Sequence, residues 1–404
     1  MNIARLKIEL LVYGMQIDLE SLALLEFKSD KYQHNNRHCG ESVFNTRIPQ
    51  EIKLFSEEQN IWIVVGVLLR LDSPYKLIFS DKLLLYLNDT PLDVTVKLLD
   101  EPYTWSQMTS DGQPMHRIIS IPGYNEINLW TWHDCGFQIE GMGCAFCTTT
   151  KTSRQLQNSQ QRDLLSAYNL LKSSSENILN IQYPIFLKNS IEALNTVLTK
   201  DYPSTDYWLT IIGGNLSMAK LDINALFVSN LIHDLIANIP CIDSNKLGCN
   251  IMPPNDFSYI KDIKHSGAGF FMMNIEIWDD AIWSKVCPGK SRYGKKKFVE
   301  AMTYAVCEFG PGKVWCNFVC GIEPMYIQLT GFSELASKGI VPGANIFHKD
   351  PGAKANFFEN YTVDDYASFY LKAADILHKN GLQPFYSLES RRSSLLWEAY
   401  LGIL

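Results

Sequence analysis

The sequence predicts an α/β protein: a partial (β/α)6 barrel of the TIM type, preceded by a small N-terminal α+β domain. Its 404 residues exceed the size of one average domain. Beyond about residue 125, short strand-like runs alternate with longer helical stretches, whereas before about residue 103 short apolar runs follow one another with turn signals between them. We expect the N-terminal domain over residues 1–105, the barrel over 106–390 and a C-terminal extension over 391–404.

The N-terminal part is predicted from its short apolar runs. Turn-forming groups such as Asp72-Ser73-Pro74 and Asn88-Asp89 separate them, which favours a small α+β or mainly β domain. The polar stretch at about 28–47 lacks periodicity and is predicted to be a loop. The apolar runs cover residues 8–13, 61–69, 76–79, 83–87 and 94–98.

The barrel part is predicted from six strand-and-helix units in a row, which imply parallel strands joined by helical crossovers. Such a pattern fits a doubly wound sheet or a barrel. No G-x-G-x-x-G motif follows the first strand, which disfavours a dinucleotide-binding sheet. The predicted strands cover residues 127–131, 207–212, 247–252, 270–277, 314–321 and 340–347. The predicted helices cover residues 162–172, 191–198, 223–239, 257–265, 296–307 and 326–338.

Composition narrows the function classes. With 46% hydrophobic and 20% charged residues, the chain has the composition of a folded globular protein. The net charge of -7 argues against a sequence-independent nucleic-acid binder, which needs an excess of Lys and Arg. A small-molecule substrate is therefore expected. No apolar run approaches the roughly 20 residues of a membrane helix, and the first residues do not read as a secretory signal, so we expect no membrane span and a cytoplasmic location.

Three of the ten cysteines are clustered. Cys135, Cys144 and Cys147 form a C-x8-C-x2-C pattern directly after the first predicted strand. Iron-sulfur clusters take cysteine thiolates as ligands, and an electron-transfer cluster uses four. In a cluster of four irons, three thiolates leave one iron without a protein ligand, so that this iron can bind a substrate or cofactor. The alternative is a structural zinc site completed by His133 or a distant cysteine, but the paired motifs typical of such sites are absent from the sequence.

Two further features follow predicted strands, where the chemistry of a (β/α) barrel lies. Gly213-Gly214-Asn215 follows the second strand, and Asn274-Ile275-Glu276 lies near the end of the fourth. The glycines also fit a tight strand-to-helix turn, and Glu276 also fits a solvated loop acid. An ionised carboxylate in the apolar run 270–278 is costly unless it is paired or faces a wet cavity.

The motif Cys144-Ala145-Phe146-Cys147, placed after a first strand, resembles that of radical S-adenosylmethionine (SAM) enzymes. In that superfamily the first two cysteines usually lie closer together than they do here. The resemblance spans about residues 110–350. It implies the radical SAM kind of partial barrel, a 4Fe-4S cluster held by Cys135, Cys144 and Cys147, and SAM bound to the open iron.

The resemblance also implies SAM contacts. Gly213-Gly214-Asn215 is similar to the Gly-Gly-Glu-like element that meets the SAM amino group, although Asn lacks the charge assistance of Glu. Asn274-Ile275-Glu276 is similar to the Asn-Leu-Asp strand of the biotin synthase group, which faces the ribose and the substrate, so Glu276 is the candidate catalytic residue. Arg292 would lie near the SAM carboxylate, unless it is a surface arginine. The expected cofactor-binding residues are Phe146, Gly213, Gly214, Asn215, Asn274, Glu276 and Arg292.

A second likeness is to uncharacterised radical SAM proteins encoded beside nitrilases. It rests on a segment some twenty residues before the cysteine cluster and implies no particular substrate. The segment reads Ser110-Asp111-Gly112-Gln113-Pro114-Met115.

The resemblance implies reductive cleavage of SAM to a 5'-deoxyadenosyl radical, which abstracts hydrogen from a small molecule, with an electron donor such as flavodoxin or ferredoxin. One alternative is biotin-synthase-like sulfur insertion with an auxiliary cluster on Cys249, Cys316 and Cys320. Cys316 and Cys320 would lie about 13 Å apart along a strand, too far to share one cluster. The other alternative is a non-catalytic metal-binding scaffold.

Overall fold

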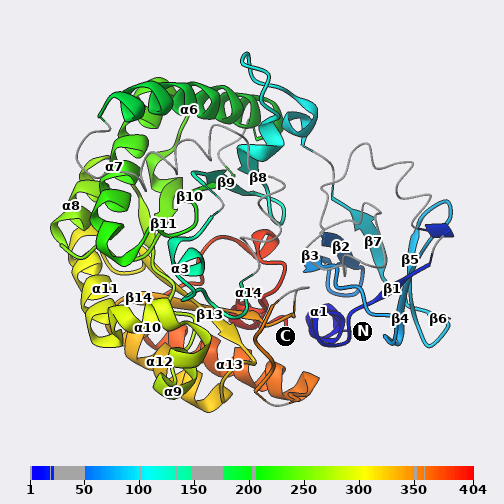
Figure 1. Ribbon diagram of the computed structural model, residues 1–404. Coiled ribbons are helices and arrows are strands. Elements are labelled where there is room, and N and C mark those ends of the chain that lie inside the picture. Colours follow the sequence, from blue (N-terminus) through cyan, green and yellow to red (C-terminus); the bar gives the residue numbers. More distant parts are fainter. Residues whose placement is uncertain are drawn as a thin grey trace.

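The computed structural model describes residues 2–18, 20–21, 51–99, 102–132, 134–147, 176–202, 206–349, 353–358 and 360–404. Its main unit is a seven-stranded sheet in the order β14-β13-β12-β11-β10-β9-β8 (Figure 1). The last six strands of the chain pair in parallel and in sequence order, and β8 (Ile119–Ser120) pairs antiparallel with β9. The predicted mixed α/β class is confirmed, while no closed sheet is found over the described ranges.

The six parallel strands begin within one residue of their predicted starts. They are β9 (Glu126–Trp130), β10 (Trp208–Ile212), β11 (Leu247–Asn250), β12 (Phe270–Met272), β13 (Val314–Cys320) and β14 (Ile340–Ile346). The predicted end of the fourth strand at residue 277 is wrong, because β12 stops at Met272. Glu276 has a φ of 72°, which a strand does not tolerate. The Asn274 side chain, rather than its backbone, accepts the Asn317 amide at 3.0 Å.

Helices surround the outer, convex face of the sheet (Figure 1). Four predicted helices are found nearly as expected, and residues 191–198 form the end of a longer helix and the π turn at Val197–Asp201. The predicted helix at 162–172 lies outside the described residues. The helices are α6 (Glu176–Thr196), α7 (Leu221–Asn238), α8 (Ser258–His265), α9 (Asp280–Val286), α10 (Pro288–Tyr293), α11 (Lys295–Phe309), α12 (Met325–Ser337) and α13 (Val363–Lys379). Among the described helices, none is both long and apolar enough to cross a membrane.

The convex face holds the thiols that an auxiliary cluster would need. Side chains alternate between the two faces of a strand. Cys249 is in register with Phe271, whose ring packs 6.0 Å from that of Phe309 in α11. Cys316 and Cys320 share the face of Phe318, whose ring lies 5.2 Å from that of Phe332 in α12. All three thiols are fully buried toward the helices rather than directed into the concave face.

The concave face is filled at the amino ends of the strands by a C-terminal segment. Trp315 stacks between Phe270 and Phe385, with ring centroids 4.1 and 5.4 Å away. Tyr386 shares a hydrogen bond of 3.0 Å with Thr210. In Figure 1 part of this segment, coloured red, lies inside the ring of strands and helices. This plug, residues 382–391, occupies the amino-end side and leaves the carboxyl ends for a site.

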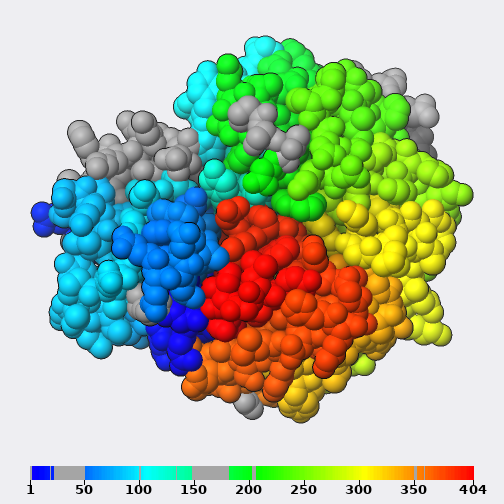
Figure 2. Space-filling model, turned by 180° about the vertical axis from the view of Figure 1, so that it is seen from behind, coloured from blue at the N-terminus to red at the C-terminus, as the bar shows by residue number. Residues whose placement is uncertain are grey.

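The N-terminal part consists of a helix and two small sheets. The run at 8–13 belongs to α1 (Ile3–Tyr13). One sheet has the order β1-β4-β5-β6 and the other β3-β2-β7. Figure 2 shows the blue N-terminal part packed beside the red C-terminal part. The strands are β1 (Gln16–Ile17), β2 (Glu51–Ser56), β3 (Ile61–Gly66), β4 (Tyr75–Phe79), β5 (Leu83–Leu87), β6 (Thr90–Pro91) and β7 (Thr95–Leu98).

Candidate functional site

The cysteine loop, residues 134–147, follows β9 at the carboxyl edge of the sheet. Cys135 precedes the short helix α3 (Gly136–Ile139). The Cys147 amide donates to the Cys144 carbonyl at 3.1 Å, so these two cysteines lie on one turn. All three cysteine residues are half-buried. The loop therefore presents its three thiols at the edge where the sequence predicted a site.

Gly213 and Gly214 are required by close packing against this loop. A Cβ atom at Gly213 would lie 2.1 Å from the Thr131 hydroxyl oxygen, and one at Gly214 would lie 1.8 Å from the Asp134 carbonyl oxygen. Real atoms do not approach so closely, so a side chain at Gly213 would displace the Thr131 side chain and one at Gly214 would require a backbone shift. The end of β10 is thus seated directly under the start of the cysteine loop.

Asn215 extends the same contact and joins β10 to β11. Its backbone carbonyl accepts the Gly136 amide at 2.6 Å. Its side-chain Oδ1 accepts the Met252 amide at 3.1 Å. This is the oxygen that the sequence assigned to the SAM amino group. An amide oxygen has two lone pairs, so one remains for a ligand.

The opposite side of the loop is held by the segment between α9 and α10. The Ala145 amide donates to the Val286 carbonyl at 2.7 Å, and the Gly289 amide donates to the Met142 carbonyl at 2.9 Å. A Cβ atom at Gly289 would lie 2.7 Å from the Phe137 ring. The cysteine loop is therefore clamped between the end of β10 and the start of α10.

Glu276 is a buried, paired acid. Its Oε1 lies 2.8 Å from Lys290 Nζ, which also donates to the Asn274 carbonyl at 2.6 Å. Only 9% of Glu276 is exposed. Burial alone would lower the pKa of Lys290, but Glu276 and the neighbouring thiols of Cys144 and Cys287 together raise it above its ordinary value. The interpretation of Glu276 as a solvated loop acid is wrong, because the side chain is buried in an ion pair.

Cys287 is a site neighbour that the sequence reasoning missed. It is fully buried, and Val286 and Gly289 on either side of it are joined to the cysteine loop by backbone hydrogen bonds. The neighbouring thiol of Cys287 lowers the pKa of Cys144, and burial, with Cys144 as a smaller cause, raises the pKa of Cys287. Burial raises the pKa of Cys135 to about 11. The signal in the sequence was its place shortly before Arg292, which the resemblance puts near the SAM carboxylate.

The remaining predicted residues border the loop in different ways. Arg292 is exposed, and its Nη1 lies 3.5 Å from the Met142 sulfur. It is therefore a surface arginine whose guanidinium contacts the cysteine loop. The Asn274 side chain joins the segment after β12 to β13 by accepting the Asn317 amide. Phe146 is partly buried on the loop itself.

The donor set fits an iron-sulfur cluster in chemistry, although the three thiols are not gathered into ligand positions. Over the ranges described, no three His, Cys, Asp or Glu side chains converge closely enough to hold a metal ion. Cys135 is still near enough to Cys144 and Cys147 for their charges to raise its pKa. His133, the proposed zinc ligand of the alternative interpretation, lies outside the described residues.

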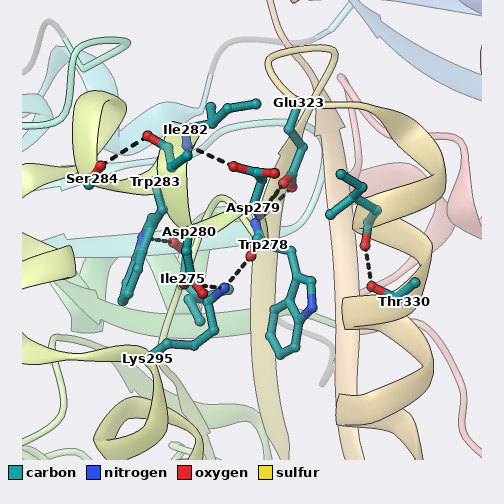
Figure 3. A network of polar contacts seen from close by, with 12 residues as sticks. Ile275, Trp278, Asp279, Asp280, Ile282, Trp283, Ser284, Lys295, Glu323 and Thr330 are labelled. Carbon is teal, nitrogen blue, oxygen red and sulfur yellow. Dashed lines mark hydrogen bonds and ion pairs between the residues drawn. The ribbon is translucent and has the colours of Figure 1, made fainter.

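Glu323 fixes the segment that follows Glu276, at Trp278 and Asp279 (Figure 3). Its carboxylate accepts the backbone amides of Trp278 and Asp279 at 2.8 and 2.6 Å. It also accepts the Gln328 side-chain amide at 3.0 Å. Burial raises the pKa of Glu323 to about 7 despite these three donors. The carboxyl end of β13 is thereby tied to the start of α9.

Replacing Glu323 by Gln is expected to flatten the pH dependence of stability. In the folded protein Glu323 keeps its proton up to about pH 7, whereas a free Glu loses it near pH 4.5. The folded state therefore binds more protons in this window, and the free energy of unfolding falls as the pH rises, by up to about 3 kcal/mol. Urea unfolding at pH 5 and pH 8 measures the difference. Glu334→Gln, an exposed change in α12, should keep the wild-type slope, and an unchanged slope in Glu323→Gln would contradict the assignment.

Comparison with known proteins finds one enzyme of similar sequence. No protein-family model matches the chain. Over 262 residues the chain is 25% identical to bacteriochlorophyllide c C-7(1)-hydroxylase of Chlorobaculum limnaeum, covering 63% of this chain and 60% of that enzyme. The match thus spans less than two thirds of the relative. Among solved structures, HydG, a maturase of the FeFe hydrogenase, aligns over 46% of this chain and 39% of its own, with 14% identity and a TM-score of 0.30.

Proposed function

We propose that the chain is an enzyme that cleaves SAM reductively and abstracts hydrogen from a small molecule. The premise of this proposal is the chain's resemblance to the radical SAM superfamily. The observation that carries this proposal is the three-thiol loop at the carboxyl edge of six parallel strands. It is seated between Gly213-Gly214 and α10, in the order in which the resemblance places the cofactor elements. The fold would then be the radical SAM kind of partial barrel.

Cys135, Cys144 and Cys147 would hold a 4Fe-4S cluster with one open iron. When bound, the cluster would supply the electron that splits SAM into methionine and a 5'-deoxyadenosyl radical, which takes a hydrogen atom from the substrate. The chain's own part is to orient these groups and exclude water. SAM would border Asn215, the Glu276–Lys290 pair and Arg292. The electron would come from a donor such as flavodoxin or ferredoxin.

The concave face holds buried polar side chains beside the plug. Asn128 Nδ2 donates to Glu126 at 3.0 Å, but its buried Oδ1 has no hydrogen-bond partner among the described residues. A buried acceptor without a partner is costly in a folded protein. Nearby, Arg391 from the plug donates to Asn345 at 2.6 Å and to Asn317 at 3.3 Å.

The positions of Cys249, Cys316 and Cys320 favour hydrogen abstraction over sulfur insertion. Sulfur insertion of the biotin synthase type needs a second cluster. Cys249, Cys316 and Cys320 point into the helix layer, and the Cys316 sulfur accepts the Ile275 amide at 3.4 Å. They are therefore poorly placed to hold an auxiliary cluster beside the concave face.

Anaerobic reconstitution with iron and sulfide, followed by a SAM cleavage assay, tests the proposed function. We expect about four irons per chain and reductant-dependent release of 5'-deoxyadenosine and methionine, measured by liquid chromatography and mass spectrometry. The same sample without reductant is the control. A loaded cluster that yields no 5'-deoxyadenosine would favour the non-catalytic scaffold, and retention of zinc in place of iron would favour the structural zinc site.

A further inference from the structure

Arg391, at the end of the plug, is a half-buried cation that forms no ion pair with the described residues. Its guanidinium carbon lies 4.7 Å from the centre of the Phe385 ring and 5.6 Å from that of the Tyr386 ring. The charged group therefore rests on aromatic side chains of its own segment. A charge that is withdrawn from water without a partner is costly in a folded protein. Arg391 is thus better explained by a function than by a contribution to stability.

The two asparagines that Arg391 contacts lie on the concave face of the sheet. Side chains alternate along a strand, so Asn317 shares the face of Trp315, whose ring stacks against the plug. Asn345 is in register with Val319, which lies on the same face. Arg391 Nη2 donates to Asn345 Oδ1 at 2.6 Å and to Asn317 Oδ1 at 3.3 Å. The guanidinium therefore reaches from the plug toward the carboxyl end of β14.

These three side chains hold more hydrogen-bond donors than their surroundings use. Both asparagine oxygens accept from the guanidinium, which leaves each Nδ2 group as a donor, and Arg391 keeps Nε and Nη1. Among the described residues, nothing accepts a hydrogen bond from any of these four groups. Asn345 is half-buried, as Arg391 is, so both residues keep access to solvent. A positive charge surrounded by free donors fits a carboxylate or a phosphate, whose oxygens accept hydrogen bonds.

The acids that influence Arg391 have other partners. Burial lowers the pKa of Arg391, and the charges of Glu126 and Glu398 oppose this shift. Glu126 accepts the Asn128 side-chain amide at 3.0 Å. Glu398 is paired with Lys7 at 2.5 Å. Neither carboxylate takes a hydrogen bond from the guanidinium, so the group is available to a ligand.

We propose that Arg391, with Asn317 and Asn345, binds an anionic group of the substrate, a carboxylate or a phosphate, on the concave face. The inference rests on the proposed function, since it takes this anion to be part of the molecule that loses hydrogen. A planar guanidinium can contact two oxygens of one anion, and the two asparagine amides supply further donors. The rest of the substrate would then extend from the plug toward the carboxyl ends of the strands, where the cysteine loop lies.

Anion binding to the full, anaerobically reconstituted chain tests the inference. The probes are sodium acetate and inorganic phosphate, titrated at constant ionic strength and followed by isothermal titration calorimetry. We expect saturable binding, and the tighter of the two anions distinguishes a carboxylate site from a phosphate site. Arg391→Gln should raise the Kd at least about tenfold, because charge-assisted hydrogen bonds are lost. Arg70→Gln, which removes an exposed arginine of the N-terminal part, should keep the wild-type Kd.

A second variant covers the case in which Arg391→Gln does not fold. Arg391→Lys keeps the charge but loses the planar fork, so its Kd should lie between those of wild type and Arg391→Gln. No saturable binding to the wild-type chain, or an unchanged Kd in whichever variant folds, would overturn the inference. Displacement of the bound anion by SAM would also overturn it, since Arg391 would then belong to the SAM site. A chain that binds the anion but never cleaves SAM would instead refute the proposed function and leave the anion site in place.

Discussion

Replacing Cys144 by Ala is expected to abolish the cluster and all 5'-deoxyadenosine formation, and Cys135→Ala and Cys147→Ala are expected to do the same. A site with three thiolates has no spare protein ligand, so the loss of one leaves two irons without a protein ligand. The folded loop cannot substitute another thiol easily, since it is clamped between Gly214 and α10. Iron content, visible absorbance and the yield of 5'-deoxyadenosine after reconstitution measure the effect.

The matched controls for this prediction are buried thiols of the same sheet. Cys249→Ala and Cys316→Ala change residues that face the helices, so both proteins should keep about four irons and full SAM cleavage. Full activity in any one of the three loop variants would make the ligand assignment wrong. Close to eight irons in wild type, falling to about four when Cys249 and Cys316 are both replaced, would make sulfur insertion the leading proposal.

The starts of the parallel strands could be predicted because these strands are buried on both faces and appear as apolar runs. The end of β12 could not. It depends on the left-handed backbone of Glu276 and on the Asn274 side chain, which bonds Asn317 across the sheet. The plug was missed for a similar reason. No local pattern shows that Phe385 stacks on Trp315, although the two rings lie 5.4 Å apart.

The candidate site also contains some residues that could be predicted from the sequence and others that could not. The cysteine loop and Gly213-Gly214 were visible as motifs, because their function and their packing both depend on short spacings. Lys290 and Cys287 could not be recognised as part of the site from a motif, because each lies there through contacts with residues elsewhere in the chain. The Glu276–Lys290 pair joins the segment after β12 to α10, and Cys287 is brought beside the cysteine loop by the backbone bonds of Val286 and Gly289. Burial of Glu276 was foreseen as costly unless paired, but the sequence did not identify the partner.

Replacing Lys7 by Met is expected to lower the free energy of unfolding by about 3–5 kcal/mol, because it leaves a buried carboxylate without its counter-charge. Lys7 Nζ lies 2.5 Å from Glu398 Oε1, and both side chains are fully buried. The same ammonium donates to the Arg391 carbonyl at 2.6 Å. Glu398 Oε2 has no hydrogen-bond partner among the described residues, so without Lys7 the nearby charge of Arg391 is the main favourable charge left for the carboxylate. Urea unfolding followed by tryptophan fluorescence measures the change.

The double change Lys7→Met with Glu398→Leu separates the ion pair from the packing. It removes both charges and keeps similar volumes, so most of the lost stability should return. Lys338→Met, an exposed change at the end of α12, should remain close to wild type. A Lys7→Met protein as stable as wild type would show that Glu398 is neutral in the folded state, and a double variant as unstable as the single one would show that shape matters more than charge. Because Glu398 and Arg391 belong to the segment that forms and follows the plug, loss of Lys7 should also weaken the support of the concave face.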